Sequence, residues 1–171
     1  MIYRQPLPHE ALTQGDILDD CPLLYWDESI FAVEAQLRSM TTRARIVVLT
    51  QACDLAQAKA TRVLVAIVHS TQHLVRRGIL KGQLIRDQVR CHRVYGWYFL
   101  PSGDPMEESI VDLHHLHTLP RAVLERLIGE GKRVTSISTP YREHLGQHFA
   151  ATYARIGLPL PYETQATRGE S

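Results

Sequence analysis

The fold of this 171-residue chain is decided by two apolar stretches, Arg45–Thr50 (RIVVLT) and Val63–Val68 (VLVAIV). Both are rich in β-branched residues and carry no charge after Arg45, which is typical of strands buried on both faces of a sheet. The polar segment Gln51–Thr61 between them is expected to be a loop. Because neither stretch suits an exposed edge, we predict that they are adjacent, antiparallel, central strands of a strongly curved sheet.

Further strands are expected on both sides of this pair. They are predicted from apolar residues that alternate or are β-branched, at Gly15–Leu18, Ile30–Leu37, Tyr95–Leu100 and Ile110–Leu113. Polar turns are predicted at Ser39–Thr42 and at Pro101–Pro105, where turn-forming residues cluster.

Helices are expected mainly in the C-terminal third. One begins at Pro120 and ends at Gly129, and the next runs from Pro140 to about Ile156. The second should face the sheet through four residues at helical spacing, namely Leu145, Phe149, Tyr153 and Ile156. A short helix or irregular excursion is expected at Leu80–Val89. The sequence thus predicts a single α+β domain over residues 1–163 and a flexible tail over 164–171.

Composition limits the classes of partner. Nineteen basic and eighteen acidic residues give a net charge of +1, so binding to nucleic acid would need a local patch of charge. The three cysteines are irregularly spaced, which indicates reduced thiols. The N-terminal sequence lacks a signal-peptide pattern, and no apolar run approaches the ~20 residues that cross a bilayer. We therefore expect a cytoplasmic protein with no membrane partner.

Basic residues concentrate in two segments that are far apart in the sequence. The candidates for binding a nucleic-acid backbone are Arg38, Arg43 and Arg45 in the first segment and Arg76, Arg77 and Lys81 in the second. If the two segments meet, they form a groove for phosphates in which Tyr95, Trp97 or Tyr98 stacks on bases. The alternative is a solvated surface with the aromatic residues in the core.

The pair Cys53-Asp54 is a candidate for nucleophilic catalysis. Cys53-Asp54 follows a buried strand, and a thiolate there is a nucleophile that His69, at the end of the neighbouring strand, would activate. The alternative is a small buried hydrophobe beside a turn-forming aspartate.

Histidines are also numerous. His114, His115 and His117 cluster, and His144 and His148 share one helix face. Because no carboxylate or cysteine follows at a recognised ligand spacing, we predict no metal and no cofactor.

The order of these elements resembles the PemK/MazF family of growth-inhibitor toxins. The matching segments are Gly15-Asp16-Ile17, Arg45–Gln51, Val63–Val68 and Val111–Gly157. The resemblance implies an SH3-like β-barrel with C-terminal helices that cleaves single-stranded RNA without metal. It also implies a homodimer and an antitoxin protein as partner.

The chain departs from the family at two positions. Ile46 stands where the family has a proline, and Val68 stands where it has a catalytic serine or threonine. The resemblance then leaves Arg45 to stabilise the phosphorane charge and His69 to replace the missing hydroxyl as acid or base. The alternative function is a non-catalytic binding module that kept the fold and lost the catalytic pair.

Overall fold

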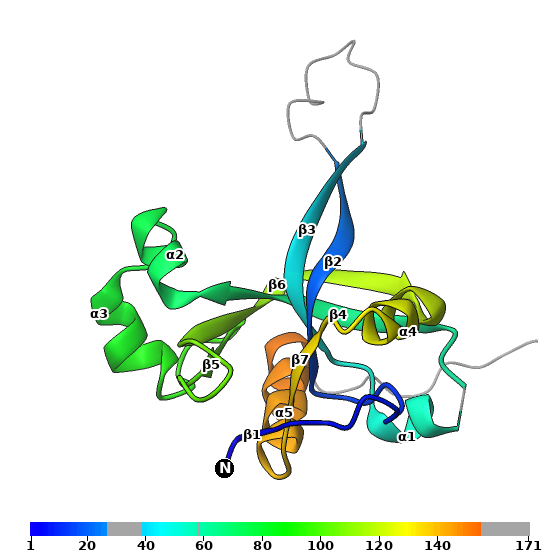
Figure 1. Cartoon of the computed structure of the whole chain (residues 1–171). Helices are drawn as coiled ribbons and strands as arrows, with labels where there is room; N and C mark the ends of the chain where they lie inside the picture. Colours follow the sequence, from blue (N-terminus) through cyan, green and yellow to red (C-terminus); the bar gives the residue numbers. More distant parts are fainter. Residues whose placement is uncertain (27–38, 58, 155–171) are drawn as a thin grey trace, which may run out of the picture.

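The computed structural model describes residues 1–26, 39–57 and 59–154, which form one antiparallel sheet with helices packed on it (Figure 1). Seven strands lie in the order β1-β7-β2-β3-β4-β6-β5, and the sheet is strongly curled into a half-barrel. The strands are β1 (Tyr3–Arg4), β2 (Asp16–Trp26), β3 (Ser39–Val48), β4 (Arg62–Ser70), β5 (Trp97–Leu100), β6 (Ser109–Pro120) and β7 (Arg133–Ile137). The helices are α1 (Ala52–Ala56), α2 (Thr71–Arg76), α3 (Gly82–Leu84), α4 (Arg121–Gly129) and α5 (Tyr141–Tyr153), with a π-helical turn at Ile85–Val89.

These observations confirm the predicted α+β class, the curved antiparallel sheet and the C-terminal helices. The more specific likeness to an SH3 barrel stays a prediction. Within the described residues, no helix is both long enough and apolar enough to cross a membrane.

The two stretches that decide the fold are neighbours at the centre of the sheet. Three residues of β3 pair with three of β4, from Ile46 opposite Ile67 to Val48 opposite Val65. Successive side chains of a strand point to opposite faces, and both faces are buried along this ladder. The predicted central, antiparallel pair is therefore confirmed.

Each face of the sheet carries its own hydrophobic core. On one face, Val47 and Ala66 belong to a core that includes Leu145 of α5. On the other face, Ile46 belongs to a core that includes Leu124 of α4. The two C-terminal helices therefore cover opposite faces of the central strands, which explains why Ile46–Leu49 and Val63–Val68 are apolar at every position.

Several predicted boundaries differ from the structure. Ser39–Thr42, expected as a turn, belongs to β3 because it pairs with Leu23–Trp26 of β2. The expected loop between β3 and β4 contains the short helix α1. β6 continues far beyond the predicted Ile110–Leu113, since β4 offers it a partner as far as Pro120. The predicted strand at Ile30–Leu37 and the tail at 164–171 lie outside the described residues.

Two of the four residues predicted to face the sheet from helix α5 pack against its core. Leu145 is fully buried, and Phe149 packs against the same core while only partly buried. Tyr153 is 55% exposed, although its hydroxyl donates to the carbonyl oxygen of Leu113. The sequence did not predict that His148 would be buried, and Ile156 lies outside the described residues.

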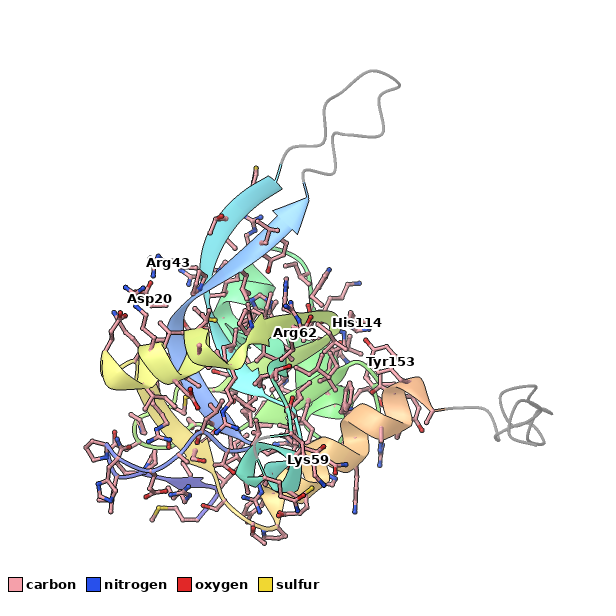
Figure 2. The ribbon with its side chains drawn as sticks, turned by 90° about the vertical axis from the view of Figure 1, so that its right-hand side faces the viewer. Asp20, Arg43, Lys59, Arg62, His114 and Tyr153 are labelled. Atoms are coloured by element: carbon pink, nitrogen blue, oxygen red, sulfur yellow. The ribbon has the colours of Figure 1, made fainter. Side chains whose placement is uncertain are left out.

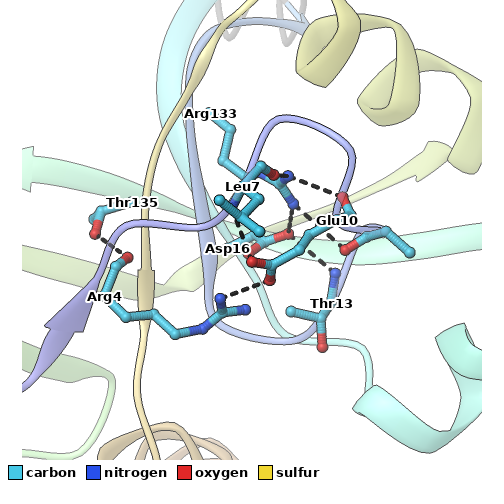
Figure 3. Close-up of polar contacts among 8 residues, drawn as sticks. Arg4, Leu7, Glu10, Thr13, Asp16, Arg133 and Thr135 are labelled. Carbon is cyan, nitrogen blue, oxygen red and sulfur yellow. Dashed lines mark hydrogen bonds and ion pairs between the residues drawn. The ribbon is translucent and has the colours of Figure 1, made fainter.

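A buried ion pair ties the start of β2 to β7 (Figure 3). Arg133 Nη1 lies 3.1 Å from Asp16 Oδ2, and the two side chains are 4% and 0% exposed. Arg133 also donates to the carbonyl oxygens of Leu7 and Glu10, and the Thr13 N–H donates to the Asp16 carboxylate. Burial raises the pKa of Asp16 despite these hydrogen bonds and the Arg133 charge. The Asp16 of the Gly-Asp-Ile segment therefore has a structural role, which is to hold the N-terminal segment on the sheet.

Candidate functional site

The main candidate site is an opening between β3 and β4, which we call the fork. Their ladder ends at Ile46 and Ile67, and from there β3 follows β2 into a hairpin that projects from the sheet (Figure 1). The opening is a hollow of about 610 Å³ between Thr42–Arg45 of β3 and Ile67–Ser70 of β4. Tyr25 of β2, side chains of α2 and the loop residue Glu107 complete its lining.

Three arginines line the fork, and β2 supplies acidic partners to two of them. Arg45 binds Asp19 through two hydrogen bonds, from Nε (2.5 Å) and from Nη2 (2.9 Å), and this raises the pKa of Arg45. Arg43 lies 3.2 Å from the Asp20 carboxylate, and Figure 2 shows the two side by side on the hairpin. Arg76, on α2, forms no ion pair with any carboxylate in the part of the chain that the structure describes.

A bulge in β6 places an aspartate and two histidines beside the fork. The register with β4 shifts at Asp112, which lies opposite Ile67, so that the next three residues of β6 have no partner in β4. The bulge turns His114 and His115 back onto Asp112, with Nδ1 atoms 3.1 Å and 2.7 Å from its carboxylate. Bulges re-aim side chains in this way and are over-represented beside functional sites.

Asp112 is a buried carboxylate surrounded by donors. Its side chain is 4% exposed. Burial alone would raise its pKa, but hydrogen bonds from the His115 ring and from the His114 backbone N–H hold the pKa below its usual value. Asp112 is therefore an anion at neutral pH, and it orients the imidazoles around it.

His69 connects this cluster to the fork. It lines the fork, and its Nε2 lies 4.0 Å from the Asp112 carboxylate. Burial lowers the pKa of His69, which Asp112 opposes and the rings of His73 and His115 reinforce. His73, which also lines the fork, stacks on His69 with ring centroids 6.1 Å apart. Two imidazoles that face one hollow suit general acid–base chemistry, because histidine is the side chain most often used for it.

The structure brings some of the predicted site residues together and separates others. Those that line the fork are Arg43, Arg45, Arg76 and His69. Arg77 and Lys81 are not part of its lining, and Lys81 lies beside a smaller hollow. Arg38 lies outside the described residues.

Val68, which stands where the resemblance implies a catalytic hydroxyl, and His69 face opposite sides of β4. The Val68 side chain packs in the core that α5 covers and is 6% exposed. A shift of one residue along a strand reverses the face, so His69 lies on the other side, next to Asp112. The fork is therefore lined by His69, one residue after Val68, and by the hydroxyl residue Ser70, two residues after it.

Cys53 and Asp54 lie in α1, at the other end of the β3–β4 pair. Because the strands are antiparallel, His69 lies beyond the end of the ladder formed by Ile46 and Ile67, whereas α1 follows the opposite end, after Val48. The expectation that His69 activates Cys53 is therefore wrong. Cys53 lines a separate hollow of about 550 Å³ with Arg142 and Glu143, and no histidine is in its described lining. A cysteine-dependent reaction there would need another base.

Sequence reasoning missed Asp112, His73 and Asp19 as site residues. Asp112 does leave a signal, because a carboxylate inside the apolar run Ile110–Leu113 is costly to bury unless it is paired. The other two leave none. The position of His73 depends on the turn from β4 into α2, and that of Asp19 depends on the pairing of β2 with β3.

A second histidine cluster lies between α5 and the end of the π-helical turn. The predicted His144–His148 pair meets His92, whose ring centroid lies 4.6 Å from that of His144 and 5.8 Å from that of His148. His144 Nδ1 also lies 3.1 Å from the Tyr98 hydroxyl. The Nδ1 of His92 and the Nε2 of His148 are buried without a hydrogen-bond partner. Across the described residues, no group of three or more His, Cys, Asp or Glu is arranged to hold a metal ion.

We expect acid to destabilise the protein through this second cluster. Burial lowers the pKa of His92 and of His148, and the neighbouring rings add to the effect. As pH falls below the ordinary histidine value of about 6.5, the unfolded chain therefore takes up protons before the folded chain does. The contribution to the free energy of unfolding is complete above that pH and decreases below it.

Denaturant titrations at pH 7.5 and 5.5 would measure this loss. The difference between the two pH values should shrink in the variant His92→Phe and stay unchanged in His9→Ala, which removes an exposed histidine. Equal pH dependence in His92→Phe and the natural sequence would contradict the prediction.

No family model matches this chain, and no curated protein matches it. The resemblance to growth-inhibitor toxins, with the homodimer and the antitoxin partner that it implies, stays a prediction. The functional argument therefore depends on the geometry of the fork and of the histidines around Asp112.

Proposed function

We propose that this protein binds single-stranded RNA in the fork and cleaves it by metal-independent acid–base catalysis. The observation that carries the proposal is the pair His69 and His73, which face one hollow, with His69 lying beside the buried anion Asp112. The lowered pKa of His69 keeps its imidazole neutral at pH 7, so that it can accept a proton.

The chemistry uses the ribose 2′-hydroxyl of the RNA as nucleophile. His69 takes the proton of this hydroxyl while its oxygen forms a bond to the adjacent phosphorus. The bond from phosphorus to the 5′-oxygen breaks, and the leaving oxygen takes a proton from His73. The products are a 2′,3′-cyclic phosphate and a 5′-hydroxyl. DNA, which lacks the 2′-hydroxyl, would bind without being cleaved.

Arginines of the fork would stabilise the charge that develops on the phosphoryl oxygens. Arg76 is free of ion pairs within the described part of the chain. Arg45 has five N–H donors and uses two on Asp19, while its Nη1 lies 3.8 Å from the sulfur of Met106. Its remaining donors suit a phosphate, although Asp19 already balances its charge.

Binding can be tested through its dependence on salt. Arg76→Ala should weaken binding to single-stranded RNA and reduce the log–log salt slope by about 0.7, because one phosphate contact is lost. Arg45→Ala should reduce the slope less, since Asp19 neutralises that arginine. Arg76→Lys should restore most of the slope but only part of the affinity, because an ammonium keeps the positive charge but lacks the planar guanidinium that binds two phosphate oxygens at once.

Fluorescence anisotropy with a labelled RNA oligomer at several salt concentrations measures both quantities. Arg126→Ala serves as the control, because Arg126 is 81% exposed on α4 and lines none of the hollows described above. If no RNA binds even at low salt, where electrostatic attraction is strongest, the RNA proposal is wrong.

A second candidate is an RNA-binding module that does not cleave. It is favoured by Val68, which has no hydroxyl at the position where the resemblance implies a catalytic serine or threonine and which packs in the core. It is also favoured by the pairing of Arg45 with Asp19. Incubating labelled RNA with the protein in EDTA, followed by a denaturing gel, separates the two candidates. Binding without any cleaved product would select the binding module.

A further inference from the structure

We infer that the hollow next to the fork holds one nucleobase of the bound RNA, stacked on Trp97. This inference rests on the proposed function, which places the RNA backbone in the fork. The hollow, which we call the base pocket, has a volume of about 560 Å³, within the range of roughly 300–1,000 Å³ that small ligands occupy. Its lining includes Tyr25, Ile67, His69, Leu74, Trp97 and Asp112.

The base pocket adjoins the fork. Tyr25, Ile67 and His69 belong to the linings of both. His69 therefore stands between the place proposed for the phosphate and the place inferred for the base. A nucleotide whose phosphate meets the arginines can thus extend its base past His69 into the neighbouring hollow.

The two hollows differ in the way that the charged phosphate and the flat, largely apolar base of a nucleotide differ. The fork is lined by arginines and histidines, whereas apolar and aromatic side chains form much of the base pocket. Trp97 lies opposite Asp112 in the β5–β6 ladder, so both project from the same face of the sheet. The partly exposed rings of His114 and His115 add nitrogen atoms that suit the polar edge of a base. Aromatic stacking with a few polar contacts is how many proteins bind unpaired bases.

A glycine fixes the arrangement of two rings in the base pocket. The His114 ring lies edge-on to Trp97, with centroids 5.0 Å apart and an angle of 61° between the planes. Gly96 makes this arrangement possible: its φ is +84°, and a Cβ there would lie 2.2 Å from the His114 ring. The orientation of Trp97 therefore depends on a glycine at the preceding position.

Of the three aromatic residues that the sequence offered for stacking, Trp97 is the one in the lining. Tyr98 is 1% exposed in the core, where burial raises its pKa to about 12. Tyr95 is exposed but is not part of the lining of the base pocket. The expectation that Tyr98 can stack on a base is therefore wrong.

Tryptophan fluorescence provides a direct test. The chain has two tryptophans, so the variant Trp26→Phe leaves Trp97 as the only reporter. A six-nucleotide single-stranded RNA should quench this fluorescence as it binds, and an oligomer of the same length made of abasic ribose phosphates should bind without quenching. In the otherwise natural chain, Trp97→Leu should weaken RNA binding by about 5- to 150-fold and leave the salt slope unchanged, while Trp97→Phe should keep most of the affinity.

The outcomes separate this inference from the proposed function. Quenching by RNA together with a selective loss in Trp97→Leu supports the base pocket. RNA binding with no quenching and equal affinity in Trp97→Leu overturns the inference and leaves the proposed function standing. No RNA binding to the natural sequence at low salt overturns both. The quenching measurement leaves Trp97 in place, so it does not depend on whether Trp97→Leu folds.

Discussion

Replacing His69 by alanine is expected to lower the rate of RNA cleavage by about 10²–10⁴-fold, the usual contribution of a general acid or base. His69 is the histidine that faces the fork and also lies beside the buried Asp112 carboxylate. Without it, the imidazole proposed to take the proton of the 2′-hydroxyl is missing from the fork. The rate would be measured on a labelled RNA oligomer in EDTA, alongside binding affinity, which should change much less.

Two variants control for this result. His9→Ala removes an exposed histidine that lines none of the hollows described above, so cleavage should be unaffected. Cys53→Ala changes a residue at the other end of the β3–β4 pair and should also leave cleavage intact. A loss in Cys53→Ala with none in His69→Ala would instead favour a cysteine-dependent enzyme.

The second large effect concerns stability. Arg133→Met should lower the free energy of unfolding by about 3–5 kcal/mol, because it leaves the buried Asp16 without its ionic partner. The two side chains are 4% and 0% exposed, so little water can replace the lost contact. The change also removes the hydrogen bonds from Arg133 to Leu7 and Glu10. Urea denaturation at neutral pH measures the loss.

Arg126→Met is the matched control for this stability prediction. Arg126 pairs with Glu130 on the surface of α4 and is 81% exposed, so its loss should cost at most about 1 kcal/mol. The double variant Asp16→Leu with Arg133→Met should recover part of the stability, because it leaves no buried charge unpaired. If Arg133→Met unfolds at the same urea concentration as the natural sequence, the ion pair does not hold the N-terminal segment.

The elements that sequence predicted well are those specified by their own residues. The sequence predicts the strands at Arg45–Thr50 and Val63–Val68 because every position after Arg45 is apolar or β-branched, as a strand with cores on both faces requires. The helix after Pro120 was recognised from its apolar spacing and its terminal residues. Ser39–Thr42 was mistaken for a turn because its strand pairing comes from a distant segment, Leu23–Trp26.

The sequence by itself determined the two central strands of the sheet, because burial on two faces leaves a local pattern in the chain. It also named Arg45 as a candidate from the concentration of basic residues and the family resemblance, and His69 from its position at the end of a strand. Only the tertiary structure decided which polar groups meet: Asp19 with Arg45, and Asp112 with His114, His115 and His69. Those contacts depend on strand register and on a bulge of three residues in β6. Register is a property of two segments at once, so one segment read alone carries no record of it.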